Sequence, residues 1–490
     1  MTKNQLDKPN KELTFDQQEA FEAFASWLEN EQPEKPFVLS GYAGSGKTFL
    51  SMKFLRKIED SSFCWTVAAP THKAVGVLRQ ALQNEGIKPT WYPSTIHRLL
   101  RLKLKRRGSI ELCEQTDQTL NSLEELGLVL IDEASMIDSH LLEIVLQCAH
   151  PFRTRLIFVG DPAQLPPIGE SRSQVFSIKR SSKAQLNQVV RHQGPVLGLA
   201  SRFRDGRLPC SSPPCLPLIK TNQGLTGFLE EKDWLVKAQS ALREGAEQDD
   251  PDAARILCYT NRTLERLVPH VRRAIHGEMA DQLPVLPGEV LISRTAVMAP
   301  ASLDGGESGE EPDMVIGSNR ELLVRDVTPE VCDLADFGLS ELKDGNPPKI
   351  ETLIVNALSG ELDLSLRLLP PVGSHSRKIL DNTLQDLSRQ AKDALKKEGR
   401  SLWRKFFLVR DAFASLGPAA VLTVHRSQGS TFRDVFVASD VFWPKDLVLR
   451  RQLVYVAVSR ASKGVWLVGD EKQNGMKDLW EQQLRESKCD

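Results

Sequence analysis

The sequence predicts an α/β fold made of two parallel-sheet units, with a small β-hairpin insertion in the first unit and a β subdomain inserted in the second. Short apolar runs followed by helix-like stretches are typical of buried parallel strands, and they occur between residues 36 and 160 and again between residues 254 and 469. Residues ~290–415 replace this rhythm with short alternating segments, which favour antiparallel strands. A chain of 490 residues is long enough for about three or four domains.

These changes of pattern give the expected domain boundaries. The Pro- and Ser-rich stretch 210–215 marks a loop between the two units. The expected segments are residues 1–98 and 119–205 for the first unit, 99–118 for the hairpin, 206–290 and 416–490 for the second unit, and 291–415 for the β subdomain with a helical arm.

The first unit contains a phosphate-binding loop at Gly41–Thr48, which fits the pattern G-x-x-x-x-G-K-[ST]. An apolar run precedes the loop and the helix-like stretch Phe49–Leu55 follows it, which is the setting that the motif requires. Glycines let backbone N–H groups close around phosphate, and the start of the following helix faces the same anion. The expected ligands are Gly41, Ala43, Gly44, Ser45, Gly46, Lys47 and Thr48, with Lys47 on the β- and γ-phosphates of ATP and Thr48 on Mg²⁺.

Gln17 lies near the start of a helix-like stretch before this loop, and two interpretations fit it. Thr14 is suited to cap that helix, and Gln17 would then complete a capping box. A glutamine shortly before a phosphate-binding loop also matches the hydrogen-bonding edge of adenine. Both interpretations remain open on these residues alone.

Two carboxylates follow a buried strand of the first unit. The apolar run Leu126–Ile131 leads directly into Asp132 and Glu133. Downstream of a phosphate-binding loop, such a pair suits Mg²⁺ coordination by Asp132 and activation of the attacking water by Glu133. A single carboxylate in this place would be explained as a helix cap.

Two further polar residues are candidates for the same chemistry. Gln164 lies in a loop stiffened by prolines after the strand Thr154–Gly160, where its amide is placed to sense the γ-phosphate. The stretch Leu186–Ala200 is expected to form a helix that carries Arg191. An arginine near the transferring phosphoryl group stabilises its charge in the transition state.

Small polar residues and histidines follow two other strands of the first unit. The first cluster contains Thr71 and His72, and the second contains Ser94, Thr95 and His97. Ligands bind at the carboxyl ends of strands in open α/β sheets. Helix caps next to buried histidines would explain either cluster without a ligand.

A basic run at residues 98–107 predicts a charged hairpin. Arg101, Lys103 and Lys105 alternate with leucines, Gly108 and Ser109 give a turn, and a short return strand follows. A solvated edge ribbon would have the same pattern, but its place between two sheet strands makes it an insertion on the ligand side.

The second unit has the same rhythm but no phosphate-binding loop. Its expected strands are residues 254–262, 421–424, 435–438 and 464–469, with a helix at residues 264–275. The inserted β subdomain is expected to include strands near residues 321–324 and 350–358, a loose acidic loop at 304–313 and a charged helix at 376–399.

Bulk properties exclude several classes of protein. The net charge is −1, so a nucleic-acid partner would need a local basic groove. The eight cysteines form no C-x-x-C pair and have no zinc-like spacing to histidines, which favours free thiols in a reducing cytoplasm. Neither a leader nor a run of about 18 apolar residues is present, so we expect a cytoplasmic protein with no membrane partner.

The order of these motifs, completed by two stretches near the C-terminus, resembles superfamily 1B DNA helicases of the RecD-like and Dda-like family. The two stretches are Leu422–Thr431 and Leu453–Ala461. They follow, in order, Gln17, the phosphate-binding loop, Ala69–His72, Ser94–His97, Asp132–Met136, Gly160–Pro167 and Arg191. Ordered matches over nearly the whole chain are far more specific than any one of them.

The resemblance implies two RecA-like domains with ATP and Mg²⁺ between them, a hairpin that acts as a strand-separating pin, and an SH3-like insertion. Lys47, Thr48, Asp132, Glu133 and Gln164 would lie on one side of the nucleotide. Arg191 and Arg460 would close the site, and Gln428 and Gly429 would couple nucleotide to DNA. The expected DNA contacts are Thr71, His72, Ser94, Thr95, His97, Arg101, Lys103, Lys105, Thr423 and His425.

The implied function is an ATP-dependent DNA helicase that moves 5′-to-3′ on single-stranded DNA and unwinds duplex. The expected partners are single-stranded DNA and single-strand/duplex junctions, with single-stranded-DNA-binding or recombination proteins as further partners. Two alternatives remain open. One is a RecD-like motor subunit of a recombination nuclease, and the other is an ATP-driven remodeller of protein–DNA complexes without strand separation.

Overall fold

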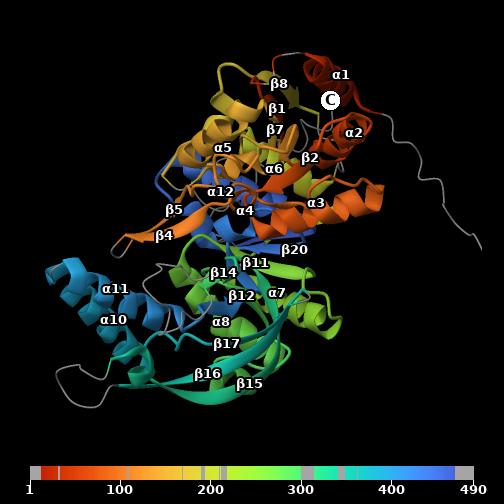
Figure 1. Ribbon diagram of the computed structural model, residues 1–490. Coiled ribbons are helices and arrows are strands. Elements are labelled where there is room, and N and C mark those ends of the chain that lie inside the picture. The colour runs from red at the N-terminus through yellow and green to blue at the C-terminus, as the bar shows by residue number, and fades with distance from the viewer. Residues whose placement is uncertain are drawn as a thin grey trace, which may run out of the picture.

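The computed structural model describes residues 13–30, 32, 34–107, 110–167, 169–188, 194–208, 210, 218–298, 314–339, 348–360, 362–394 and 396–468. Two six-stranded sheets and one five-stranded sheet organise this part of the chain. We call the sheet of order β3-β2-β6-β7-β1-β8, with its helices, the first body, and the sheet of order β19-β11-β20-β21-β10-β9 the second body. The five-stranded sheet is the β insertion. Figure 1 shows the first body, in red to yellow, at one end, the β insertion, in teal, at the other, and the second body between them.

The sheet of the first body is parallel throughout. Its strands are β1 (Phe37–Gly41), β2 (Trp65–Ala69), β3 (Ser94–Thr95), β6 (Leu128–Ile131), β7 (Arg155–Gly160) and β8 (Ser182–Leu186). The helices connecting them are α1 (Phe15–Glu29), α2 (Lys47–Glu59), α3 (His72–Glu85), α4 (Ile96–Leu99) and α5 (Ser139–Phe152). Both faces of the sheet are covered by buried apolar clusters, which is why the strands are continuous apolar runs.

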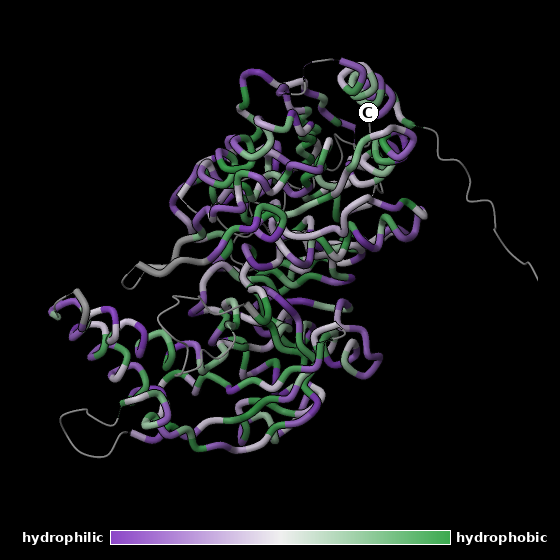
Figure 2. Tube along the Cα trace, viewed as in Figure 1, coloured by the Kyte–Doolittle hydropathy of each residue, from purple (hydrophilic) through white to green (hydrophobic). Residues whose placement is uncertain are grey.

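The sheet of the second body is parallel except for its edge strand β9. Its strands are β9 (Ile219–Thr221), β10 (Gly224–Leu229), β11 (Ala254–Cys258), β19 (Val421–Thr423), β20 (Phe432–Val437) and β21 (Ala461–Val468). The helices are α6 (Pro195–Arg204), α7 (Glu231–Glu247), α8 (Asn261–His276), α9 (Met279–Gln282) and α12 (Leu447–Ser459). Figure 2 shows hydrophobic residues gathered on the strands inside the molecule and hydrophilic residues on the outer helices.

The β insertion is antiparallel and carries a helical arm. Its strands are β12 (Val290–Ser293), β15 (Glu321–Asp333), β16 (Lys349–Ser359), β17 (Leu362–Arg367) and β18 (Leu416–Pro418), with a separate pair β13 (Val297–Met298) and β14 (Met314–Ile316). The arm consists of α10 (His375–Asp393) and α11 (Lys396–Asp411), which pack together. The predicted hairpin is present as β4 (Lys103–Arg107) and β5 (Ile110–Glu114), and it extends on the same side of Figure 1 as the arm.

The expected helix at Leu186–Ala200 is confirmed only from Pro195 onward, and its expected start at Leu186 is wrong. Leu186 ends β8, which pairs with β1, and α6 begins only at Pro195. The apolar side chains of α6 then pack in the core of the second body, against α12. From Pro195 onward the chain therefore packs in the second body, which is earlier than the boundary expected at residue 205.

Other expectations differ in smaller ways. The single charged helix expected at 376–399 is two helices, because the chain turns back between residues 393 and 396. Strand β18 pairs with β12 of the β insertion, although it lies just past the boundary expected at 415. Elements β9, β10 and α7 had no counterpart among the predictions. In the described part of the chain, we find no helix with the length and apolar character needed to cross a membrane.

Candidate nucleotide site and nucleic-acid interface

The candidate site lies where neighbouring parallel strands of the first body end. Strands β2, β6, β7 and β1 are consecutive neighbours in the sheet. They end at or just before Thr71, Asp132, Asp161 and Gly41, respectively. Since the carboxyl ends of parallel strands share one edge, the sheet brings the phosphate-binding loop, the carboxylates and one polar cluster to the same side of the body.

The phosphate-binding loop depends on glycine at specific positions. Gly46 has φ +86°, in the left-handed region, and a Cβ there would lie 2.4 Å from Gln17 Nε2. At Gly41 a Cβ would lie 2.6 Å from Ser45 Oγ. The loop leads into α2 at Lys47, so the N-terminus of a 13-residue helix faces the loop.

Gln17 anchors this loop. It completes the capping box with Thr14, as one of its two interpretations predicted. Its Nε2 also donates a hydrogen bond of 3.2 Å to the Ser45 carbonyl. The buried side chain therefore ties helix α1 to the loop, and adenine recognition by Gln17 stays a prediction.

The Lys47 ammonium lies over the loop itself. Its Nζ donates to the carbonyls of Gly41 at 2.8 Å and Tyr42 at 3.0 Å. Thr48, the next residue, is exposed. The ammonium and the hydroxyl therefore both lie at the start of α2, as the motif requires.

Asp132 and Glu133 form a strained, electrostatically unfavourable pair. Glu133 has φ +53°, which is uncommon for a residue other than glycine and is often found at functional sites. Burial and the Glu133 carboxylate raise the pKa of Asp132 to about 7, against the opposing effects of the Glu133 N–H and of Lys47. Adjacent carboxylates supply oxygen ligands of the kind that Mg²⁺ prefers, and a bound cation would offset the repulsion between them, so these residues fit a divalent cation.

Gln164 is buried, and its Oε1 has no hydrogen-bond partner among the described residues. A buried acceptor without a partner costs about 1–3 kcal/mol. Such an acceptor can take a hydrogen bond from a bound water or ligand.

Residues of the second body reach this site through Tyr455 of helix α12. Its hydroxyl donates to Asp161 Oδ2 at 2.6 Å and accepts from the backbone nitrogen of Ala43 at 2.8 Å. Burial and the Asp161 carboxylate raise the pKa of Tyr455, so the hydroxyl keeps the proton that it donates. No site role had been assigned to Tyr455 from the sequence. The available signal was a tyrosine within the apolar run 453–458, because a buried hydroxyl requires a polar partner.

A second contact between the bodies comes from Gln428. Its Nε2 donates to the Leu165 carbonyl at 3.1 Å, one residue after Gln164. Gly429 follows with φ +73°, and a Cβ there would meet Ala74 and Thr71 of the first body at 3.7 and 3.9 Å. These two predicted coupling residues therefore lie between the nucleotide loops and the start of α3.

Of the two arginines expected to close the nucleotide site, the structure describes only Arg460. Arg460 is buried, and its guanidinium donates to the Val456 and Ser430 carbonyls and to the Ser459 hydroxyl, all within the second body. Its action on the nucleotide stays a prediction. Arg191 lies outside the described residues.

The polar clusters of the first body are adjacent because β2 and β3 pair, with Ala69 opposite Thr95. Thr71 caps α3 by accepting from Ala74 N at 3.2 Å, and Thr95 caps α4 by accepting from Arg98 N at 3.3 Å. The capping interpretation of both threonines is thus confirmed, which leaves their predicted contact with DNA as an additional role. Ser94 is half-buried beside Thr95.

The histidines of the clusters are uncharged near neutral pH. Burial lowers the pKa of His97, and burial followed by the charge of Arg320 lowers the pKa of His72. Burial also lowers the pKa of His425, whose ring lies 6.3 Å from that of Tyr259. Neutral imidazoles can donate hydrogen bonds to phosphate but add no net charge.

The remaining expected DNA contacts lie at the hairpin and at the end of β19. Arg101 and Lys103 are exposed at the base of the hairpin, and the side chain of Lys105 lies outside the described residues. Thr423 ends β19, opposite Cys258 of β11. The basic side chains of the hairpin and the pair Thr423 and His425 of the second body thus belong to different elements. That one DNA strand passes along both stays a prediction.

Comparison with known proteins agrees with this arrangement. The sequence profile of an AAA domain matches residues 12–210, and that of a UvrD-like helicase C-terminal domain matches residues 418–468. The ATP-dependent DNA helicase Dda of Enterobacteria phage T4 is 23% identical over 444 residues, which cover 88% of this chain and 93% of Dda. The RecBCD subunit RecD of Buchnera aphidicola is 31% identical over 147 residues, which cover 27% of this chain and 23% of RecD.

Solved structures of Pif1 helicases give weaker matches. Bacteroides Pif1 with ADP-AlF3 and single-stranded DNA aligns over 96% of this chain and 98% of its own, at 16% identity and a TM-score of 0.43. Candida albicans Pif1 aligns over 98% of this chain and 100% of its own at the same identity and TM-score. By these two profiles and the full-length likeness to Dda, the chain is similar to superfamily 1 DNA helicases of the Dda and RecD types, and its two parallel-sheet bodies agree with the two-domain fold that this similarity implies.

Proposed function

We propose that this helicase couples ATP hydrolysis between its two bodies to 5′-to-3′ movement along single-stranded DNA, and that this movement unwinds duplex. The observation that carries the proposal is the Tyr455 hydroxyl, which joins the phosphate-binding loop and Asp161 to a helix of the other body. A nucleotide that moves the loop must therefore also disturb the contact between the bodies. The phage T4 relative supports the reaction class by its name, ATP-dependent DNA helicase.

In this proposal the nucleotide site is divided between the bodies. Lys47 neutralises the β- and γ-phosphates, Glu133 orients the attacking water, and Gln164 senses the γ-phosphate through its amide N–H, while its unpaired Oε1 can accept from the water. Arg460 would leave its carbonyl partners to stabilise the developing charge, together with Arg191. Thr48 and Asp132 would hold Mg²⁺, which when bound neutralises phosphate charge.

DNA would be held by the polar clusters of both bodies. In the first body Thr71 and Thr95 would contact the DNA backbone. In the second body Thr423 and His425 would do so. Contacts to the phosphate backbone are independent of sequence and weaken with salt. Alternate grip and release by the two clusters, as the bodies close and reopen, would produce net movement along the strand.

ATP turnover by Lys47→Ala tests the site directly. We expect this variant to lose DNA-stimulated hydrolysis. Its affinity for single-stranded DNA should stay within about threefold of wild type, because the predicted contacts to DNA phosphates lie elsewhere. Lys53→Ala is the matched control, since Lys53 is on the same helix but lies over the Phe49 ring at 5.5 Å. Normal hydrolysis by Lys47→Ala would refute the assignment.

A further inference from the structure

Glu321 lies at a junction of three parts of the molecule. It is the first residue of β15 in the β insertion. Its Oε1 accepts from Lys73 Nζ, on α3 of the first body, at 3.4 Å. The same oxygen accepts from Arg255 Nη2, on β11 of the second body, at 3.2 Å. One carboxylate oxygen therefore joins the β insertion to both bodies.

The two cations also share an aromatic ring. Lys73 Nζ lies 5.3 Å and the Arg255 guanidinium carbon 4.9 Å from the centre of the Phe432 ring, at the start of β20. Cations at such distances are attracted to the face of an aromatic ring. Burial opposes ionisation of Glu321, but the charges of Lys73 and Arg255 outweigh it and hold the pKa of Glu321 below its ordinary value. The carboxylate thus stays charged at neutral pH.

The two ion pairs differ in how firmly they are held. The Arg255 side chain is 5% exposed, and its guanidinium also donates to the carbonyls of Pro251 and Ala254 within the second body. The Lys73 side chain is 28% exposed and is flexible by nature. Movement of one body against the other would therefore break the Lys73 pair first and leave the Arg255 pair intact.

A second contact joins the β insertion to the same place on α3. Gly317 lies so close to His72 that a Cβ at this glycine would be 2.6 Å from His72 Cδ2. His72 and Lys73 directly follow Thr71, the predicted DNA grip of the first body. The β insertion therefore touches two successive residues next to that grip.

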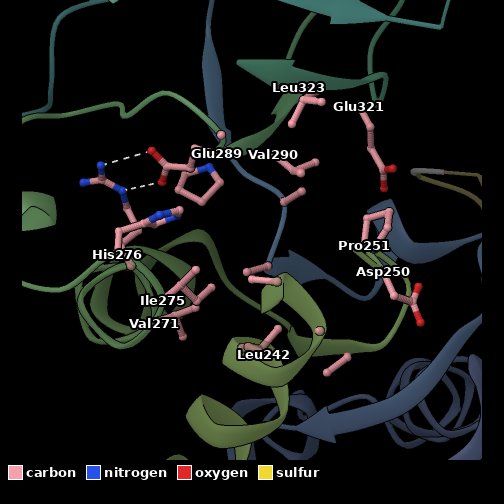
Figure 3. A pocket seen from close by; sticks show the side chains of 18 of the residues that line it. Leu242, Asp250, Pro251, Val271, Ile275, His276, Glu289, Val290, Glu321 and Leu323 are labelled. Atoms are coloured by element: carbon pink, nitrogen blue, oxygen red, sulfur yellow. Dashed lines mark hydrogen bonds and ion pairs between the residues drawn. The ribbon is translucent and has the colours of Figure 1, made fainter. Parts of the chain in front are cut away.

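Beside this junction, a cavity of about 580 Å³ lies between the β insertion and the second body, and Glu321 and Arg255 are among the residues that line it. Figure 3 shows Glu321 and Leu323 on one side of it and Glu289, which forms an ion pair with Arg272, on another. That pair is buried, with Arg272 Nε 2.6 Å from Glu289 Oε1. The Glu321–Arg255 pair and the Arg272–Glu289 pair thus border a region without continuous apolar packing. Close packing resists movement, and the cavity interrupts it over part of the contact between the β insertion and the second body.

We propose that Glu321 is a positioning residue, which transmits the approach of the first body to the β insertion by forming its bond with Lys73 when the bodies close. This inference rests on the proposed function, because it requires the bodies to move during the ATP cycle. Without the carboxylate, hydrolysis and DNA binding continue, but closure no longer sets the position of the β insertion. The expected defect is therefore in the coupling of ATP hydrolysis to strand separation.

Glu321→Gln tests the inference, with Glu330→Gln as the matched control. Glu330 lies on the same strand, and its pair with Arg367 at 2.6 Å is confined to the β insertion, with 27% exposure against 29% for Glu321. We would measure DNA-stimulated ATP hydrolysis, affinity for single-stranded DNA, and base pairs separated per ATP. Glu321→Gln should keep the first two within about twofold of wild type and lower the third at least about fivefold, within the usual range of coupling effects. Glu330→Gln should match wild type in all three.

A double-mutant cycle separates this role from simple loss of stability. Lys73→Gln should reproduce the coupling defect, and the double variant should be no worse than either single variant because both remove the same bond. Additive defects, normal coupling in Glu321→Gln, or an equal defect in Glu330→Gln would overturn the inference alone. A wild-type protein that hydrolyses ATP with DNA but separates no strands would overturn the proposed function and the inference with it.

Discussion

The Tyr455 hydroxyl donates to Asp161 Oδ2 at 2.6 Å, although the two residues lie 294 positions apart in the chain. Both residues are buried, and the same hydroxyl accepts from Ala43 N in the phosphate-binding loop. A single hydroxyl of the second body thus fixes two nucleotide loops of the first. This bond is the most direct physical link between the bodies at the candidate site.

Tyr455→Phe removes the hydroxyl and keeps the ring. Asp161 loses one partner inside the protein, so we expect the free energy of unfolding to fall by about 1–3 kcal/mol. The loop loses its anchor to the second body, and misplacement of reacting groups lowers kcat by about tenfold or more. Steady-state ATPase assays and denaturant unfolding would measure both effects. Tyr92→Phe, at a position 75% exposed, is the control, and an equal loss in that variant would contradict the explanation.

Gln164→Leu separates function from stability. Because Gln164 Oε1 is buried without a partner among the described residues, replacing it with an apolar side chain should leave the free energy of unfolding unchanged or raise it. The same change should lower kcat for ATP by about 10²-fold if the amide acts on the γ-phosphate or the water. A variant that is less stable yet hydrolyses ATP normally would show that the amide has only a structural role.

The buried His97 makes stability depend on pH. Its pKa is lowered in the folded protein, so the unfolded chain binds a proton that the folded protein does not when the pH falls through the ordinary value near 6.5. Stability from this residue is therefore present above that value and lost below it. Between about pH 7.5 and about pH 5.5, wild type should lose more unfolding free energy than His97→Asn. The exposed His140→Asn serves as the control, and it should show the full wild-type dependence.

Removing the β4–β5 hairpin tests strand separation apart from motor activity. Replacing residues 103–114 with a short Gly-Ser link removes an element that pairs only with itself among the sheets described. We expect loss of duplex unwinding with DNA-stimulated ATP hydrolysis retained, because the nucleotide loops do not depend on the hairpin. Unwinding by the shortened protein would contradict this role of the hairpin and assign strand separation to another element.

The residues that follow parallel strands could be predicted from the sequence. Each apolar run fixes a strand, and the residue after it must lie at the shared edge of the sheet, which places Gly41, Asp132 and Thr71 together. The hairpin was equally local, since alternation and a turn define it. Local pattern is sufficient in these cases because the chemistry follows directly from the end of one element.

Other parts could not be predicted, for physical reasons. Strand β10 contains Gly224 and Gly227 and lacks an apolar run, and a Cβ at Gly227 would lie 2.7 Å from the Trp466 ring of β21. The glycine is explained only by that distant neighbour. Leu186 belongs to a helix-like apolar pattern, but pairing with β1 decides its conformation. Tyr455 contacts Asp161, 294 positions away, and Glu321 contacts Lys73, 248 positions away, and no local pattern reports such contacts.

The central claim is that ATP turnover at Lys47 drives movement along DNA. The most direct test is strand separation of duplexes that carry either a 5′ or a 3′ single-stranded tail, with wild type and Lys47→Ala, in the presence and absence of ATP. We predict ATP-dependent separation of the 5′-tailed duplex by wild type and none by Lys47→Ala. Separation by Lys47→Ala at the wild-type rate, or by wild type without ATP, would contradict the claim.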